Sequence, residues 1–228
     1  MLKKYFILSL LILFNPWFMA VSDATEDASE QESVSTESSE KDQNAKTEDA
    51  NLKEAEAFIK DLGSKAIHVL TAKKDNPVQQ KKEFEEIFIN HFAVKSIATF
   101  VLGRYRRTAT TEEKKEFFEL FKQSIADVYT ERFKNYQNES FVVSHARPAG
   151  GKTKLIRVYS DIKKPNASPI EVEWKVFKDS DGEYRITDVI VEGLSMSTTQ
   201  RSEYSSIIEN HGGSLSGLNK VLKKRLAE

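Results

Sequence analysis

The apolar residues of this chain change their spacing near residue 139, and this change limits the folds that the chain can adopt. From residue 51 to residue 138 they recur every three to four positions, which is the period of an amphipathic helix. From residue 140 to residue 192 they alternate with polar residues, as in a strand with one buried face. Two more helices are expected at 199–210 and 215–226. The order of elements predicts an α+β domain with helices covering one face of an antiparallel sheet.

Four strands are predicted in the middle of the chain. They are separated by turns at residues 148–151, 165–166 and 179–182, where Pro, Asn, Asp and Gly gather. Such short gaps predict an antiparallel meander. In the last strand the alternation changes phase near Thr187 and Asp188, which predicts a β-bulge there. The predicted strands are Phe141–Ala146, Thr153–Ile162, Ile170–Phe177 and Glu183–Val191.

The helices before the sheet carry recognisable start signals. Asn51 is placed to cap the first helix, and Pro77 suits the first turn of the second. A short third helix is expected to end at Gly103. Thr110 and Glu113 form a capping box at the start of the longest helix. The apolar stripe of this longest helix consists of Phe117, Leu120, Phe121, Ile125, Val128, Tyr129, Phe133 and Tyr136.

This stripe and the apolar face of the sheet are expected to face each other across an enclosed apolar cavity. A cavity of that kind suits acyl chains, because burying each CH₂ group contributes about 0.8 kcal/mol. The same side chains could instead fill a solid core, and the sequence leaves both alternatives open. The residues expected to contact acyl chains are Phe121, Ile125, Val128, Tyr129, Phe133, Val143, Ile156, Val158, Val172, Trp174, Ile186, Val189 and Met196.

Residues 1–24 have the features of a signal peptide. Two lysines precede the apolar run Tyr5–Phe14, and small residues stand before a cut after Ala24 or after Ser22. We therefore expect export and cleavage. An uncleaved membrane anchor is the alternative, because apolar residues resume at 17–21.

Residues 25–50 are expected to form an acidic, disordered linker that leads into one domain at 51–228. Residues 22–50 carry ten Asp and Glu side chains against two Lys, and they bury too little apolar surface to fold. A solubilising spacer is favoured over a tether or an acidic decoy for basic surfaces. Residues 51–228 carry 30 basic and 25 acidic side chains. This excess does not predict nucleic-acid binding, but it is compatible with visits to anionic membrane surfaces.

The residue patterns that most enzymes need are absent from the sequence. The chain has no cysteine, which excludes disulfides and thiolate chemistry. Its four histidines lack a zinc-binding spacing, and phosphate-loop and nucleophile-elbow motifs are missing. We therefore expect no metal, no cofactor and no catalysis. The alternative is a cone-shaped α+β enzyme in which Asp161 or Asp188 abstracts a proton, assisted by Tyr129 or Tyr159 and by His145.

A basic cluster of Arg104, Arg106 and Arg107 follows Gly103 directly. These side chains could contact phosphate headgroups or a partner. They could equally belong to a solvated connector between two helices.

Several stretches of the sequence resemble the MlaC or toluene-tolerance (Ttg2-type) family of periplasmic phospholipid-binding proteins. The similarity spans about residues 53–226. It departs from the family pattern at Tyr184, where Trp is usual, and at Gln200, where Tyr is frequent. The stretches that carry it are Phe92–Ala98, Val101–Tyr105, Arg107–Thr110, Phe117–Phe121, Tyr184–Ser195, Gln200–Tyr204 and Gly212–Leu222.

The resemblance implies a soluble periplasmic protein that accepts phospholipid tails in a deep cavity and catalyses no reaction. It implies lipid shuttling between the outer and inner membranes for an ABC transport system that maintains lipid asymmetry. The implied partners are an inner-membrane ABC transporter complex with an MCE-domain subunit and an outer-membrane lipoprotein–porin complex. A lipid-free periplasmic adaptor that docks onto a membrane complex is a further alternative.

Overall fold

The structure of the chain is a computed structural model that describes residues 38–72, 76–133, 139–151, 153–164 and 167–227. For residues 38–46, 70, 72 and 129–133 it describes the backbone alone. The chain divides into two compact units, residues 1–39 and 40–228, and the sheet belongs to the second. The predicted signal peptide and the linker as far as residue 37 lie outside the described residues. Among the helices that are described, none is both long enough and apolar enough to span a bilayer.

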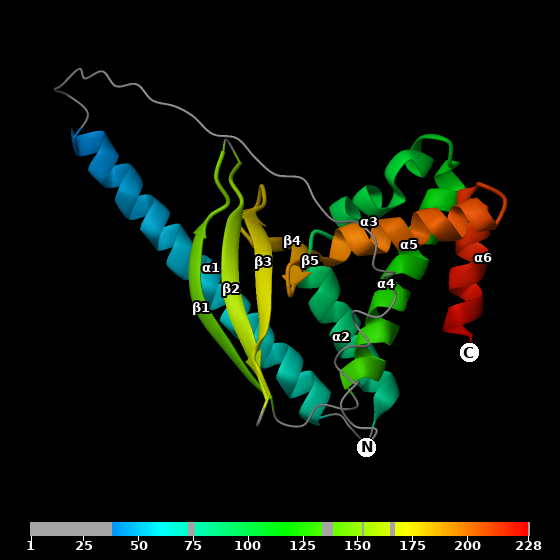
Figure 1. Ribbon diagram of the computed structural model, residues 1–228, viewed down its shortest axis with the longest axis horizontal. Helices are drawn as coiled ribbons and strands as arrows, with labels where there is room; N and C mark the ends of the chain where they lie inside the picture. The colour runs from blue at the N-terminus through cyan, green and yellow to red at the C-terminus, as the bar shows by residue number, and fades with distance from the viewer. Residues whose placement is uncertain (1–37, 73–75, 134–138, 152, 165–166, 228) are drawn as a thin grey trace. The chain divides into compact units, whose positions relative to one another are not determined.

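A five-stranded antiparallel sheet with the order β1-β2-β3-β4-β5 forms the second unit's β-layer (Figure 1). The α+β class and the four-strand meander are confirmed, but the prediction of four strands in total is wrong. The added strand has only two residues, so it leaves no alternating pattern in the sequence. It returns along β4 through a turn at Glu192 and Gly193, whose φ angles are 49° and 79°. The strands are β1 (Ser140–Pro148), β2 (Ile156–Lys163), β3 (Ile170–Lys178), β4 (Tyr184–Val191) and β5 (Leu194–Ser195).

Two β-bulges keep the apolar residues of the sheet on one face. Thr187 is the extra residue between the pairs formed by Asp188 and by Ile186, which confirms the predicted bulge. A second bulge lies in β1 between Val143 and His145. It was not predicted, because the residues of β1 are exposed or half-buried and carry a weak alternation.

The helices begin largely where the sequence signals them. The Oδ1 of Asn76 accepts from the backbone N–H of Gln79 at the start of the second helix (3.1 Å). The predicted capping box is confirmed, with Thr110 and Glu113 exchanging hydrogen bonds of 3.1 and 2.8 Å. The helical elements are α1 (Ser38–Ala72), α2 (Pro77–His91), α3 (Val94–Leu102), the 3₁₀ helix η2 (Gly103–Arg107), α4 (Thr111–Phe133), α5 (Met196–Asn210) and α6 (Leu215–Leu226).

Helix α1 starts at Ser38 rather than at the expected cap, Asn51. Residues 38–50, which we expected to be disordered, are rich in Glu, Lys and Ala, which favour helix without needing an apolar face. Lys53 and Asp49 also form a pair one helical turn apart, at 2.7 Å. The first helix therefore starts within the predicted acidic linker and continues into the domain.

The apolar face of the sheet is covered by α1, which contradicts the prediction that α4 covers it. Ala55, Ile59 and Leu62 of α1 are at most 4% exposed and pack against this face. A Cβ at Gly63 would collide with the ring of Phe141, so glycine allows this strand to approach the helix. The buried sheet residues in the contact are Val158, Val176, Tyr184 and Ile186.

Helix α4 packs within the helical half of the fold, against α2 and α6. Phe117 and Phe121 are each 1% exposed, and both rings meet the edge of Tyr204 from α5. Burial among these side chains raises the pKa of Tyr204. The predicted stripe is confirmed from Phe117 to Ile125, but its partners there are helices instead of strands. Val128 is 45% exposed, and the side chains of the remaining predicted members lie outside the described atoms.

A polar contact between α4 and α6 makes part of the stability depend on pH. Glu116 pairs with Lys223 and accepts a hydrogen bond of 2.8 Å from Asn219. The Lys223 ammonium, followed by the Asn219 amide, holds the pKa of Glu116 below its usual value. A carboxyl group whose pKa falls on folding adds stability above its unfolded pKa and loses it as the pH falls through its folded pKa.

We predict that Glu116→Gln lowers the free energy of unfolding by about 0.5 kcal/mol at pH 7, as expected for a largely solvated pair. The difference from wild type should shrink as the pH falls below the usual carboxyl value of 4.5. Urea denaturation at several pH values measures both quantities. A difference that stays constant from pH 7 to pH 3 would rule out a role for Glu116 ionisation.

Candidate functional site

The buried apolar side chains form two separate clusters. The helical cluster contains side chains of α2, α3, η2, α4, α5 and α6. The sheet cluster contains side chains of α1, β2, β3 and β4. The helical cluster consists of Phe88, Val94, Ala98, Val101, Leu102, Tyr105, Ala109, Phe117, Leu120, Phe121, Tyr204, Ile208, Leu215, Leu218 and Leu222. The sheet cluster consists of Ala55, Ile59, Leu62, Val158, Val176, Tyr184 and Ile186.

Phe92 is the partly buried apolar residue that packs against both clusters. It follows α2 directly and forms an isolated parallel bridge with Ile186 on the edge of β4. The next residue, Ala93, donates its N–H to the carbonyl of Ile186 at 2.8 Å. The segment between α2 and α3 thus attaches the helical cluster to an edge of the sheet. The spacing of apolar residues in the sequence gave no sign of this double contact.

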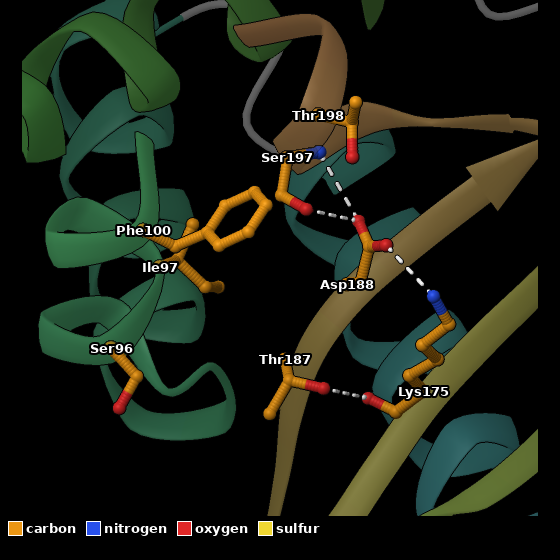
Figure 2. A pocket seen from close by; sticks show the side chains of 8 residues that line it. All are labelled: Ser96, Ile97, Phe100, Lys175, Thr187, Asp188, Ser197 and Thr198. Atoms are coloured by element: carbon orange, nitrogen blue, oxygen red, sulfur yellow. Dashed lines mark hydrogen bonds and ion pairs between the residues drawn. The ribbon is translucent and has the colours of Figure 1, made fainter. Parts of the chain in front are cut away.

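A second attachment is built around the carboxylate of Asp188, which is 8% exposed (Figure 2). Its Oδ1 accepts from the N–H and the hydroxyl of Ser197 (3.1 and 2.8 Å) and from the N–H of Val189 (3.0 Å). Its Oδ2 accepts from the hydroxyl of Ser195 (2.7 Å) and faces Lys175 Nζ (3.3 Å). The carboxylate lies at the start of α5, where the helix dipole also favours a negative charge.

A pocket of about 290 Å³ adjoins this carboxylate. Its wall combines side chains of α3 with polar groups of the sheet and of α5 (Figure 2). The volume lies near the lower limit for a drug-sized ligand and is too small for a two-chain lipid. The lining residues are Ser96, Ile97, Phe100, Lys175, Thr187, Asp188, Ser197 and Thr198.

A second pocket, of about 340 Å³, lies between α1 and α2. It includes two histidines and two glutamates, but the described residues contain no group of three or more such side chains placed to hold a metal ion. Its lining residues are Lys65, His68, Val69, Glu83, Glu86, Ile87, Asn90 and His91.

The residues of the enzyme alternative do not form a buried site: Tyr159 and Asp161 are half-buried two positions apart on β2, and His145 is exposed. Tyr159 stacks on His145 at 4.6 Å and accepts a hydrogen bond of 2.8 Å from Arg147. Strand β3 separates Tyr159 from Asp188, so about 10 Å lies between their strands. The oxygens of Asp188 already accept from the donors described above, which leaves little capacity to take a substrate proton. Asp161 is half-buried on β2, and the Tyr129 side chain lies outside the described atoms.

The predicted acyl-chain residues divide between the two clusters, and the enclosed cavity is not confirmed. Phe121 and Ile125 belong to the helical cluster, whereas Val128 is 45% exposed on α4. Val172 is buried on β3, and Met196 is half-buried at the start of α5. The side chains of Tyr129 and Phe133 lie outside the described atoms. The predicted residues that belong to or pack on the sheet cluster are Val143, Ile156, Val158, Trp174, Ile186 and Val189.

Neither pocket contains any of these thirteen predicted residues. The physical reason is that α1 covers the sheet in the place where α4 was expected. Because α1 fills the space over the sheet, α4 does not face the strands that it was expected to cover. Half-buried apolar side chains remain on both clusters, including Trp174 on the sheet and Ile125 on α4.

The three predicted arginines lie on η2 and are exposed. Arg104 pairs with Glu209 of α5 at 2.8 Å and lies over the ring of Tyr105. Arg106 and Arg107 form no ion pair with the described residues. The connector interpretation thus suits Arg104, and a role in recognition stays a prediction for the other two.

Comparison with known proteins identifies the family to which this chain is similar. The family model described as MlaC protein matches residues 60–224. The toluene tolerance protein ttg2D of Pseudomonas putida is 26% identical over 121 residues, which cover 53% of this chain and 54% of that protein. The intermembrane phospholipid transport system binding protein MlaC of Haemophilus influenzae is 24% identical over 113 residues, 49% of this chain and 53% of that protein. The chain thus spans about half the length of the curated relatives it matches.

The fold is also similar to a solved structure. A phospholipid-binding protein from Ralstonia solanacearum, solved in complex with a phospholipid, superposes with a TM-score of 0.64. The match covers 76% of this chain and 97% of that chain at 20% sequence identity. At that identity the likeness establishes a shared fold.

We predict that Phe92→Ala weakens the connection between the clusters and lowers the free energy of unfolding by about 2 kcal/mol. With Trp17 replaced by Phe, Trp174 is the one tryptophan of the chain, and its fluorescence reports on the sheet cluster. Far-UV circular dichroism reports chiefly on the helices. The urea transitions of the two signals should coincide in wild type and separate in the variant.

The matched control is Phe118→Ala, because Phe118 is also half-buried but packs against the helical cluster alone. The control should lose stability with its two transitions still coincident. Coincident transitions in Phe92→Ala would show that other contacts connect the clusters.

Proposed function

The chain belongs to the MlaC protein family, and from this premise we propose that it binds phospholipid and carries it through the periplasm. The lysines and the apolar run within residues 1–24 support export by a cleaved signal peptide. The names of the relatives, which include an intermembrane phospholipid transport protein, support the same cargo. So does the phospholipid bound to the Ralstonia solanacearum structure.

The observation that carries the proposal is the junction of two apolar clusters at one shared side chain, Phe92. On the sheet side, half-buried apolar residues such as Trp174 and Val189 surround the sheet cluster. On the helical side, Ile125 is half-buried and Val128 is 45% exposed. We infer that the acyl chains bind between these two sets of residues when the helical cluster moves away from the sheet.

Tail burial, measured against exposure of the tail to water, is large enough to hold the two clusters apart while the lipid is between membranes. At about 0.8 kcal/mol per CH₂, a tail of about sixteen carbons contributes about 13 kcal/mol. Opening at the junction would separate Phe92 and Ala93 from Ile186 and expose half-buried apolar side chains of both clusters, whose own burial is worth a few kcal/mol. The two clusters would each remain packed, so the protein could open without unfolding.

We propose that the protein acts without catalysis and exchanges lipid with two membrane complexes. One is an inner-membrane ABC transporter complex with an MCE-domain subunit, and the other is an outer-membrane lipoprotein–porin complex. Apolar binding suits such exchange, because tails held by burial alone can leave for any similar apolar surface. In this proposal the shuttle contributes to membrane lipid asymmetry.

We predict that protein purified without detergent releases phospholipid on denaturation, as measured by mass spectrometry. Val128→Glu should lower the lipid recovered per protein at least tenfold, because acyl chains cannot solvate a carboxylate. Val158 is a poor position for such a test, since it is 0% exposed beneath α1 and any larger residue disturbs packing.

The matched control is Val142→Glu, which alters a valine of similar exposure, 40%, on β1. Val142 pairs with Asp161 and lies on the opposite face of the sheet from the sheet cluster. Its substitution should leave the lipid content unchanged. Wild-type protein that carries no lipid and takes up no labelled lipid would contradict the carrier function and favour a lipid-free adaptor. Equal losses in both variants would contradict the proposed site.

A further inference from the structure

A basic surface with an exposed aromatic ring lies on α3, η2 and α5, and we propose that it docks the protein on anionic phospholipid bilayers. We name it the α3–η2 surface and define it by Phe100, Arg106, Arg107 and Arg201. The proposal rests on the carrier function only in requiring that the protein visit a membrane. The lipid cargo itself is assigned to a different part of the fold.

Within α3 and η2 the charge is strongly one-sided. Between Val94 and Arg107 the chain has four basic side chains and no acidic one. Arg104 is neutralised by Glu209 of α5. Arg106 and Arg107 are exposed and form no ion pair with the described residues, so their charges face solvent.

Arg201 and Phe100 extend the same surface. Phe100 is 41% exposed, and the guanidinium of Arg201 lies 5.2 Å from the centre of its ring. Gly103 has a φ of 52°, and a Cβ at this position would lie 2.9 Å from Nε of Arg201. Only glycine therefore lets Arg201 pack this closely against the start of η2.

These cations are close enough to act together. A 3₁₀ helix rises about 2 Å per residue, so Arg106 and Arg107 lie within about 10 Å of Gly103 along the axis. This distance is similar to the Debye length at physiological salt. Phe100 also lines the pocket beside Asp188, so a hollow of mixed polar and apolar lining adjoins the surface (Figure 2).

The combination of free arginines and an exposed ring fits a bilayer better than an acidic protein surface. Guanidinium groups bind phosphate oxygens through paired hydrogen bonds, and an anionic leaflet presents phosphates in every direction. An aromatic ring beside such cations can enter the apolar layer just below the headgroups. A rigid acidic protein would need carboxylates placed to match each arginine.

The test is co-sedimentation of the full chain with vesicles of phosphatidylcholine alone or with about 30 mol % phosphatidylglycerol. Wild type should bind the anionic vesicles more tightly and lose the difference at about 1 M salt. Arg106→Gln combined with Arg107→Gln should lower the anionic-vesicle partition coefficient about 30-fold. Phe100→Ala should lower it as well, with less dependence on salt.

The matched control is Lys60→Gln combined with Lys154→Gln, two exposed cations on α1 and on the β1–β2 connection. The control should bind like wild type, and contributions from the N-terminal segment are equal in all variants. Equal losses in both double variants, or wild-type binding that ignores phosphatidylglycerol, would overturn the proposal. The second result would leave an acidic protein as the partner.

Lipid content measured on the same variants separates docking from cargo binding. The Arg106→Gln/Arg107→Gln variant should keep its copurified phospholipid and its thermal unfolding midpoint. If it loses the phospholipid, the arginines act in the cargo site and the docking role is wrong. If wild type carries no lipid but still binds anionic vesicles, the carrier function fails while the docking surface stands.

Discussion

The carboxylate of Asp188 determines how the helical half of this protein meets its sheet. It projects from β4 and accepts hydrogen bonds from Ser195 and Ser197 at the start of α5, with Lys175 of β3 beside it. A carboxylate that is 8% exposed is stable only when its oxygens are satisfied, so the strand and the helix cannot separate here without a large cost. Because α5 packs on α3 and α6, this group and the contact of Ala93 with Ile186 together hold the helices at the edge of β4.

The helical cluster is consequently attached at the edge of β4, while α1 covers the sheet cluster. The edge of β4 is paired in two places, by β5 near its end and by Ala93 at Ile186. These attachments leave the two clusters in contact at Phe92 with half-buried apolar residues around it. The two clusters are thus held together by a few contacts at the edge of β4, and reversible binding of an apolar cargo would require some of these contacts to open.

The proposed cargo site and the α3–η2 surface use opposite physical interactions in separate places. Tail burial at the junction is non-directional and scales with area, so it tolerates different lipids. Docking through Arg106, Arg107 and Arg201 is electrostatic and reversible with salt. Separation of the two roles would allow the protein to approach a membrane without altering how firmly it holds lipid.

Local patterns in the sequence determined the α+β class, the four main strands, the bulge at Thr187 and the capping box at Thr110, because each depends on neighbouring residues. The ordered motifs from Phe92 to Tyr204 also identified the family. Strand β5 was missed because two residues carry no period, and the start of α1 was misplaced because Ser38 to Ala50 form helix without an apolar face. Only the tertiary structure decided that α1 covers the sheet and α4 packs among helices. Both helices have an apolar face, the hydrophobic effect does not choose between partners, and the choice depends on close approach at Ala55 and Gly63 and on the distant contacts of Asp188.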